Sequence, residues 1–415
     1  MLDFKTKEII KRTVPVLEAH GEAITTRFYQ RLFTRHPELK NIFNQTHQRE
    51  GKQQRALAEA VYAAALHIDR LEEILPVVQR VGHKHRGLGV KPEHYPIVGE
   101  NLLAAIREVL GEAATDEIIE AWEKAYKVIA DVFIQVEKDM YEKAEEKAGG
   151  WDGFRHFVIR KKIKESEVIT SFYLQPEDGG PIADFLPGQY LTFKMEIPGE
   201  TYTHMRHYSL SDAPGKDYYR ISIKREEGRD GKPGGIVSNY WHDQLQEGDR
   251  LAVSAPAGDF VLDTSSDCPV VLISGGVGLT PLVSMLNTLV ETGSGRDVTF
   301  IHAAQSGRHH GMKKHVRELA EKHSNIHSLV CYERPTDEDR QEGAYDREGR
   351  IDGEWLKEIN LSPDAEYYLC GPAPFMKSIY LALTQQGISA ERIRYEIFGP
   401  TNELVDQKEL ETLQS

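Results

Sequence analysis

The sequence is poor in cysteine, and the cysteines it has form no recognisable site. Only Cys268, Cys331 and Cys370 occur in 415 residues, and no Cys-x-x-Cys pair is present. A disulfide framework, a zinc site built from thiolates and an iron–sulfur cluster are therefore not expected. This usage of cysteine is typical of a protein that works in a reducing compartment.

Long hydrophobic runs and an excess of basic residues are also missing. No run of about 18 apolar residues occurs, and the charged N-terminus has no apolar core of a signal peptide. Lys and Arg number 51 against 65 Asp and Glu, which gives a formal net charge of −14. This charge argues against nucleic acid or an anionic membrane as the main partner. We expect a cytoplasmic protein, without stable membrane association, whose substrates are small molecules.

Changes in sequence pattern divide the chain into three parts. A chain of 415 residues is long enough for two to three domains. Residues 1–147 follow a helical period, 148–265 contain short alternating stretches between turns, and 266–415 alternate buried-strand and helix patterns. The chain is therefore predicted to be multidomain, with an all-α domain, an antiparallel β-barrel and an α/β domain with a parallel sheet. Residues 401–415 are polar and are expected to form a frayed tail.

The segment 81–92 carries a candidate metal ligand. His83 and His85 stand two apart, so on a helix they point to different sides and cannot both serve one small site. Two glycines and Pro92 end the helix just beyond His85. A histidine near a helix end that faces an apolar pocket can offer a neutral ring nitrogen to a metal. Most histidines in so basic a stretch are solvated instead, so the assignment depends on the rest of the domain.

Apolar stripes at helical spacing define the other helices of this domain. They predict helices over 22–33, 45–68, 95–110 and 116–147, with a break at His36-Pro37. A helix that ends near a proline, a phenylalanine six residues later (Phe43) and a histidine some forty residues on (His85) resemble the globin pattern. That resemblance implies that Phe43 packs on the haem face and that His85 is the proximal iron ligand. Lys84, beside His85, is assigned to the same cofactor.

The globin resemblance also places two residues on the distal side of the haem. Tyr29 and Gln53 fall where globins have their distal residues, and this pair in place of a distal histidine resembles a bacterial haemoglobin. A phenol and an amide can both hydrogen-bond to dioxygen on the iron. Taken alone, Tyr29 can equally be a core tyrosine with a satisfied hydroxyl.

Two more residues resemble the relay that the flavohaemoglobin family has behind the iron. His85, Tyr95 and Glu137 match its His–Tyr–Glu pattern residue by residue. A carboxylate near the other ring nitrogen of a ligating histidine makes that ligand more electron-donating, which suits oxygen activation better than storage. The alternative for Glu137 is a solvated rim charge beside Lys138 and Asp139.

A flavin signature lies in the strand-rich part. The motif Arg206-His-Tyr-Ser-Leu-Ser211, preceded by Pro187-Gly-Gln-Tyr190, resembles the flavin-binding signature of the ferredoxin–NADP reductase superfamily. Arg206 can hold the FAD pyrophosphate in a bidentate manner, Tyr208 can lie along the flavin, and Ser209 can hydrogen-bond near its reactive nitrogen. Tyr190 and His207 are assigned to the same site. The glycines of 234–239 fit a loop that opens a helix, where backbone amides accept phosphate charge.

The last part carries a nucleotide-binding pattern. Residues 269–274 read as a buried strand, and the glycine turn that follows precedes a helix predicted over 282–289. The assigned turn residues are Gly275, Gly276, Val277, Gly278, Leu279 and Thr280. Cys370-Gly371-Pro372 resembles the nicotinamide-side motif of the same superfamily, although Cys370 also reads as a small buried residue at a strand end. The closing motif supplies Glu396, Ile397, Phe398, Gly399 and Pro400, with Phe398 expected over the flavin ring.

Together these motifs resemble a flavohaemoglobin along the chain to Pro400. The resemblance implies haem b, FAD and NAD(P)H as cofactors, and nitric oxide dioxygenase activity, in which NO and O2 give nitrate. An oxygen or NO sensor with a built-in reductase is one alternative, although no output domain is visible. A general NAD(P)H flavin reductase acting on other acceptors is another. We expect a monomer that prefers NADH, because Arg308 is the only arginine near the end of the second strand that could bind a 2′-phosphate.

Overall fold

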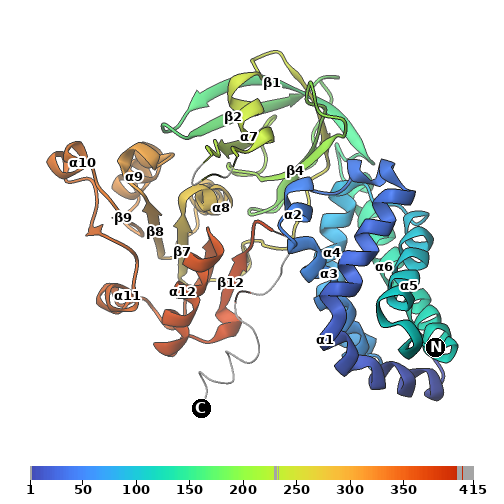
Figure 1. Cartoon of the computed structure of the whole chain (residues 1–415). Coiled ribbons are helices and arrows are strands. Elements are labelled where there is room, and N and C mark those ends of the chain that lie inside the picture. Colours follow the sequence, from blue (N-terminus) through green and yellow to red (C-terminus); the bar gives the residue numbers. More distant parts are fainter. Residues whose placement is uncertain (1, 229–230, 232, 400–403, 405–415) are drawn as a thin grey trace. The chain divides into compact units, whose positions relative to one another are not determined.

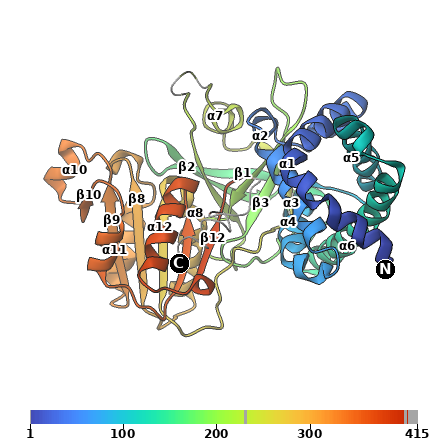
Figure 2. The ribbon, with the colours of Figure 1, turned by 60° about the horizontal axis from the view of Figure 1, so that its bottom comes forward.

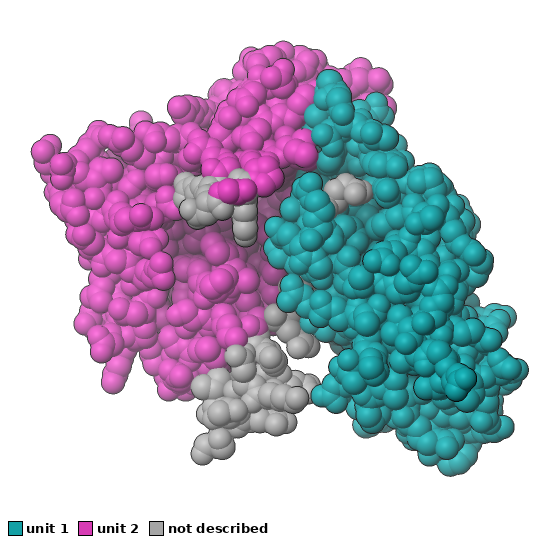
Figure 3. Space-filling model, viewed as in Figure 1, with its two compact units in different colours: residues 1–155, 192–206, 399–402 teal, residues 156–191, 207–398, 403–415 magenta. Residues whose placement is uncertain are grey.

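The computed structural model describes residues 2–228, 231, 233–399 and 404 (Figure 1). Pro400 and, apart from Leu404, the predicted tail 401–415 lie outside the described residues. Contacts divide the chain into two compact units, which Figure 3 shows in different colours. The first contains residues 1–155, 192–206 and 399–402, and the second contains 156–191, 207–398 and 403–415.

The first unit contains the helical domain. Its elements are α1 (Phe4–Arg35), η1 (Pro37–Asn41), α2 (Gln45–Arg49), α3 (Lys52–Leu66), η2 (Leu71–Ile74), α4 (Leu75–Leu88), α5 (His94–Leu110), η3 (Gly111–Ala113) and α6 (Asp116–Glu146). The predicted stripe of α1 is buried, with Ile24, Phe28 and Leu32 at most 2% exposed. The break at His36-Pro37 is confirmed, since α1 ends at Arg35.

Two helix predictions in this domain were wrong. The segment 45–68, predicted as one helix, forms α2 and α3, because Gly51 between them has a φ of 69°, which lies in the left-handed region. The first helix starts at Phe4 rather than at 22, with the Asp3 carboxylate accepting from the amide of Thr6 as its cap. Pro15 lies inside that helix, so the proline did not end it.

A six-stranded sheet with strand order β4-β3-β6-β1-β2-β5 forms the second domain. Its elements are β1 (Phe154–Lys164), β2 (Ile169–Pro176), β3 (Tyr190–Met195), β4 (His204–Ser209), β5 (Tyr219–Lys224), α7 (Ile236–Asp243) and β6 (Arg250–Ser254). β1 pairs with β2, and β2 with β5, in antiparallel fashion. An isolated antiparallel bridge between Leu210 and Ile221 connects the ends of the strand order, as a closed barrel requires.

The third domain is a parallel sheet with helices on both faces (Figure 2). Its strand order is β10-β9-β8-β7-β11-β12. Its elements are β7 (Val270–Gly275), η4 (Gly276–Gly278), α8 (Leu279–Glu291), β8 (Val298–Ala304), η5 (Gly307–His309), α9 (Lys313–Lys322), β9 (Ile326–Tyr332), α10 (Asp337–Glu342), β10 (Arg347–Glu348), α11 (Gly353–Ile359), β11 (Glu366–Cys370), α12 (Ala373–Gln385), η6 (Ala390–Arg392) and β12 (Ile393–Glu396).

Alternate residues of the parallel strands belong to different cores. Val270 and Leu272 of β7 pack with α8 and α9, whereas Val271 and Ile273 pack with α11 and α12. A strand buried on both faces reads as a continuous apolar run, which explains why this strand was readable from the sequence. Two bounds differ from the prediction: α8 starts at Leu279 rather than at 282, and the strand predicted over 269–274 is β7, Val270–Gly275.

A buried carboxylate links the barrel domain to the parallel-sheet domain inside the second unit. The Asp212 side chain accepts from the Asn287 amide of α8 at 2.8 Å, and its backbone oxygen accepts from the Ser284 hydroxyl at 2.7 Å. Burial raises the pKa of Asp212, but the Arg220 charge and the hydrogen bonds outweigh it and hold that pKa below its ordinary value. The carboxylate therefore stays charged and bonded at this junction.

Candidate functional site

His85 lies on the last turn of α4, which ends with Gly89 in the left-handed region at a φ of 76°. Its Nδ1 is 2.7 Å from Glu137 Oε1, and the Tyr95 hydroxyl donates to the same oxygen at 2.6 Å. A carboxylate oxygen only accepts, so Nδ1 of His85 carries the hydrogen. With the hydrogen on Nδ1, Nε2 is the ring nitrogen that can offer a lone pair to a metal.

Glu137 is buried, with 3% of its surface exposed, so it is not a solvated rim charge. Burial raises the pKa of Tyr95, and the Glu137 carboxylate raises it further because a negative neighbour disfavours phenolate. The phenol consequently remains a neutral donor. The structure thus brings the three predicted relay residues together from α4, α5 and α6.

Tyr29 and Gln53 lie on α1 and α3 of the same domain. Tyr29 is 6% exposed and packs against Phe43 in an edge-on arrangement, with ring centroids 5.7 Å apart. Burial raises the pKa of its hydroxyl, and a hydrogen bond with the Gln48 side chain opposes that rise. Gln48, on α2, also donates to Gln53 Oε1 at 2.9 Å. The sequence reading missed Gln48, because no helical period places it beside the other two residues.

A group of cations surrounds His47 on α2. Burial and the charges of Lys52, Arg206 and Lys84 together lower the pKa of His47 to about 4, with burial the largest cause. Arg206 and Lys84, both predicted to bind cofactors, therefore act on the same place in the first unit. Lys84 also donates to the backbone oxygen of Gly399 at 3.1 Å. This positive cluster suits the anionic groups of a cofactor.

The other flavin candidates lie in the second unit. The rings of Tyr190 and His207 are 4.8 Å apart, and Tyr208 packs edge-on against Trp241. His207 is exposed on β4, whereas Ser209, two residues on, is buried. Gly235 is the N-cap of α7, so the predicted glycine loop does open a helix.

The nucleotide motifs meet at the carboxyl edge of the parallel sheet. Cys370 of β11 is in register with Ser274 of β7 and with Glu396 of β12. A Cβ on Gly278 would lie 2.2 Å from the backbone oxygen of Cys370, so only glycine lets the two segments approach so closely. Gly276 has a φ of 55° and open space in front of it, as a turn that binds phosphate through its backbone requires.

Cys370 is fully buried, and burial raises the pKa of its thiol well above the ordinary value. A neutral buried thiol is a poor nucleophile. The prediction that Cys370 is a small buried residue at a strand end is confirmed, because it is the last residue of β11. A role at the nicotinamide side remains a prediction about packing against the ring.

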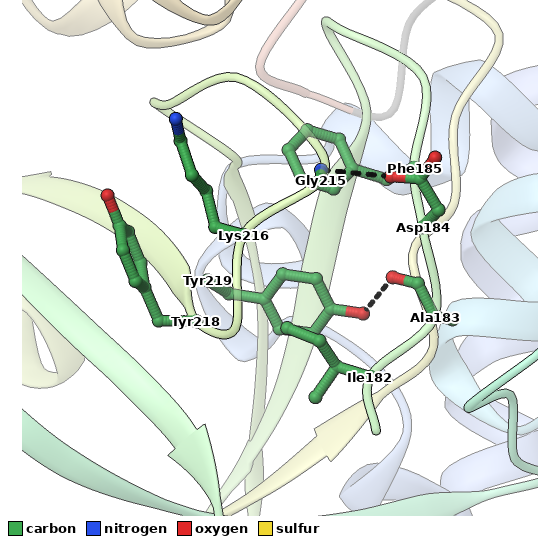
Figure 4. Close-up of a pocket in the computed structure, with 8 residues that line it drawn as sticks. All are labelled: Ile182, Ala183, Asp184, Phe185, Gly215, Lys216, Tyr218 and Tyr219. Atoms are coloured by element: carbon green, nitrogen blue, oxygen red, sulfur yellow. Dashed lines mark hydrogen bonds between the residues drawn. The ribbon is translucent and has the colours of Figure 1, made fainter.

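A pocket of about 190 Å³ in the barrel domain holds none of the predicted site residues (Figure 4). Its polar groups already have partners. The Tyr219 hydroxyl donates to the Ala183 oxygen, the Gly215 amide donates to the Asp184 side chain, and Lys216 forms an ion pair with Glu291. We therefore assign no ligand to this pocket.

The three parts of the chain match three known domain families. The globin family matches residues 26–133, the oxidoreductase FAD-binding domain matches 156–262, and the oxidoreductase NAD-binding domain matches 272–380. A protein of Halalkalibacterium halodurans named flavohemoprotein is 57% identical over 403 residues, which cover 97% of this chain and 98% of that protein. The chain belongs to the flavohemoprotein family.

Solved structures of flavohemoproteins agree with the assignment. The Malassezia yamatoensis flavohemoglobin, solved with bound FAD and haem, is 27% identical and has a TM-score of 0.82, covering 96% of this chain and 100% of that one. The FAD/NAD-binding domain of a Vibrio cholerae nitric oxide dioxygenase is 38% identical, with a TM-score of 0.54, and covers 60% of this chain and 100% of that one.

The residues described above include groups suited to each cofactor of a flavohemoprotein. Nε2 of His85 suits haem, the positive cluster around Arg206 suits a phosphate group of FAD, and the glycine turn at 275–278 suits a dinucleotide. Within the described ranges, no helix has both the length and the hydropathy that spanning a bilayer requires.

Proposed function

We propose that the chain is an NAD(P)H-dependent nitric oxide dioxygenase that removes nitric oxide. The net reaction is 2 NO + 2 O2 + NAD(P)H → 2 NO3− + NAD(P)+ + H+, so one hydride supplies the two electrons that the two nitrates need. The observation that carries the proposal is the arrangement of His85 and Tyr95 on the buried Glu137 carboxylate, in a globin domain joined to FAD- and NAD-binding domains. A protein that only carries oxygen needs no FAD- and NAD-binding domains to supply electrons.

When bound, FAD accepts hydride and releases single electrons, and haem supplies the iron at which O2 and NO combine. The protein orients and tunes these groups. His85 would hold the iron through Nε2, while Glu137 keeps the hydrogen on Nδ1 and makes the ring a stronger donor. Tyr29 and Gln53 would hydrogen-bond to the oxygen substrate, and Phe43 and Lys84 would contact the haem.

The residues of the FAD- and NAD-binding domains would hold the other two cofactors. Arg206 would hold the FAD pyrophosphate, with Tyr190, His207, Tyr208 and Ser209 around the flavin. The turn residues 275–280 would bind the dinucleotide phosphates at the start of α8, and residues 370–372 and 396–400 would border the nicotinamide and the flavin. We further propose domain bounds of 1–147, 148–265 and 266–415, a monomeric state, and a cytoplasmic location.

The decisive assay is NADH oxidation in air with and without nitric oxide. The dioxygenase proposal requires nitric oxide to stimulate steady oxidation, with one nitrate formed per nitric oxide consumed. A sensor would bind nitric oxide without sustained turnover. A general flavin reductase would oxidise NADH equally well with quinones or ferric complexes and would gain nothing from nitric oxide.

NADH is expected to be preferred over NADPH. Arg308, the only nearby candidate for a 2′-phosphate, lies on η5 with its Nε 3.8 Å from a carboxylate oxygen of Glu167. Both side chains are more than half exposed, so this ion pair contributes little stability. Glu167 nevertheless competes with a 2′-phosphate for the charge of Arg308. The ratio of kcat/KM for the two cofactors tests the preference. A higher kcat/KM for NADPH contradicts it, and Glu167→Gln should move the ratio towards NADPH.

Tyr29→Phe is expected to speed the release of oxygen. The change keeps the ring in its aromatic cluster and removes one donor to the oxygen ligand. A hydrogen bond to a charged acceptor is worth about 1.5–3 kcal/mol, so dissociation should quicken by about one to two decades. Stopped-flow measurement of the dissociation rate checks this. An unchanged rate would mean that Tyr29 is only a core tyrosine.

A further inference from the structure

Three glutamines form a continuous chain of hydrogen bonds on the distal side of the helical domain. The Gln54 amide nitrogen donates to the backbone oxygen of Gln48 at 3.2 Å and to Gln48 Oε1 at 3.1 Å. The Gln48 amide nitrogen in turn donates to Gln53 Oε1 at 2.9 Å. All three side chains are partly buried.

The backbone oxygen of Gln48 fixes the direction of this chain. A carbonyl oxygen only accepts, so the Gln54 amide must turn its nitrogen towards Gln48. Gln48 then receives that donor on its own oxygen, which leaves its nitrogen to face Gln53. Gln53 receives a donor on its oxygen, so its NH2 group is left to point elsewhere.

Gln54 is itself held by the fold. The Thr25 hydroxyl of α1 donates to the backbone oxygen of Gln54 at 2.9 Å, which ties the start of α3 to α1. Gln48 is held by α2, whose first turn is capped by Asn44 Oδ1 accepting from the amides of Thr46 and His47. This series of hydrogen bonds therefore connects α2 to α3, and each of these helices is anchored near its start.

The Gln48 side chain also forms a hydrogen bond with Tyr29, which opposes the effect of burial on the pKa of the Tyr29 hydroxyl. Gln48 therefore contacts both residues of the distal pair.

We propose that Gln48 is a positioning residue that makes Gln53 a donor to the oxygen substrate, with Gln54 and the backbone oxygen of residue 48 setting the direction. This inference rests on the proposed function, because it takes this side of the domain as the oxygen site. It adds a residue to that site and states which end of the Gln53 amide faces the ligand. A partly negative ligand oxygen needs donors, so the opposite direction would weaken its binding.

Two substitutions of Gln48 test the direction. Gln48→Met removes both amide groups at nearly constant length. Gln48→Glu introduces a carboxylate that only accepts, so Gln53 must turn its NH2 group towards position 48. Arg49→Met is the matched control, since Arg49 is the next residue on α2 and is exposed.

The readouts are the C–O stretching frequency of the ferrous carbon monoxide complex and the oxygen dissociation rate. Both need haem but neither NADH nor nitric oxide. Donors near the ligand lower the stretching frequency, so it should rise in Gln48→Met and rise further in Gln48→Glu. Oxygen release should quicken by about twofold to tenfold in Gln48→Met, the range of one neutral hydrogen bond, and by more in Gln48→Glu. Arg49→Met should match the parent.

Frequencies and rates equal to the parent's in either Gln48 variant would overturn the inference. A Gln48→Glu protein that fails to retain haem would leave Gln48→Met to decide. Failure of the proposed function looks different. In that case nitric oxide would not stimulate NADH oxidation in the parent, while the infrared shifts of the Gln48 variants would persist.

Discussion

His85→Ala is expected to yield a folded chain that retains FAD and loses stable haem. The substitution removes the only ring nitrogen that the Glu137–Tyr95 pair prepares for a metal, since Nδ1 donates and Nε2 is left free. Alanine is the best helix former, and the His85 side chain is about one third exposed, so α4 itself should persist. The flavin and nucleotide residues named in the second unit are untouched.

Haem absorbance per chain and flavin released on denaturation measure this result. The parent should show a Soret band and one FAD, whereas His85→Ala should show flavin with little or no Soret band. His83→Ala is the matched control, because it removes a histidine from the same helix two residues earlier. If His83→Ala loses haem and His85→Ala retains it, the ligand has been assigned to the wrong histidine.

The parts of the fold that the sequence predicted well are those where burial dictates the residue pattern. The alternating stretches 190–195 and 219–224 predict two strands and the apolar run 298–304 a third. β3, β5 and β8 have these bounds, because such runs between turn residues admit few other structures. The end of α4 was equally readable, since Gly89 takes the left-handed conformation that helix ends favour. These strands and this helix end depend only on residues that are close together in the sequence.

Features that depend on contacts distant in the sequence were missed. Gly51 looks like a tolerable glycine in a long helix until its positive φ divides α2 from α3. That division turns α2 so that Gln48 reaches Gln53, a contact that helical spacing from one continuous helix would not give. Asp212, which joins two domains, was missed for the same reason.

The relay residues were predicted only through the family resemblance. The residues alone left Glu137 open between a rim charge and a buried partner of His85. Its 3% exposure and its two short hydrogen bonds decide between these readings. A carboxylate is costly to bury, so the bonds from His85 and Tyr95 are also what allow it to lie there.

Glu137→Gln is expected to lower nitric oxide turnover while leaving both cofactors in place. The amide keeps the size of the side chain and an oxygen that can accept from Tyr95 and from Nδ1 of His85. It removes the negative charge, so the substitution isolates the effect of charge from that of packing. Donation from the ring to the iron should then weaken, and losses of about 10–100-fold are typical when such a partner of a metal ligand is changed.

Asp139→Asn provides the matched control for charge on the same helix. Asp139 is exposed two residues further along α6, where a surface change typically falls within about ±0.5 kcal/mol. It should leave turnover and spectra unchanged. Haem content, flavin content and the rate of flavin reduction by NADH should equal the parent's in both variants, because the reductase residues are not altered.

The iron–histidine stretching frequency of the ferrous protein, read by resonance Raman spectroscopy, tests the mechanism without relying on turnover. A hydrogen bond to a carboxylate gives the imidazole partial anionic character and strengthens its bond to the metal. Glu137→Gln should therefore lower this frequency, and Asp139→Asn should not. Lower turnover with an unchanged frequency would mean that Glu137 acts through packing, and its place in the relay would have to be withdrawn.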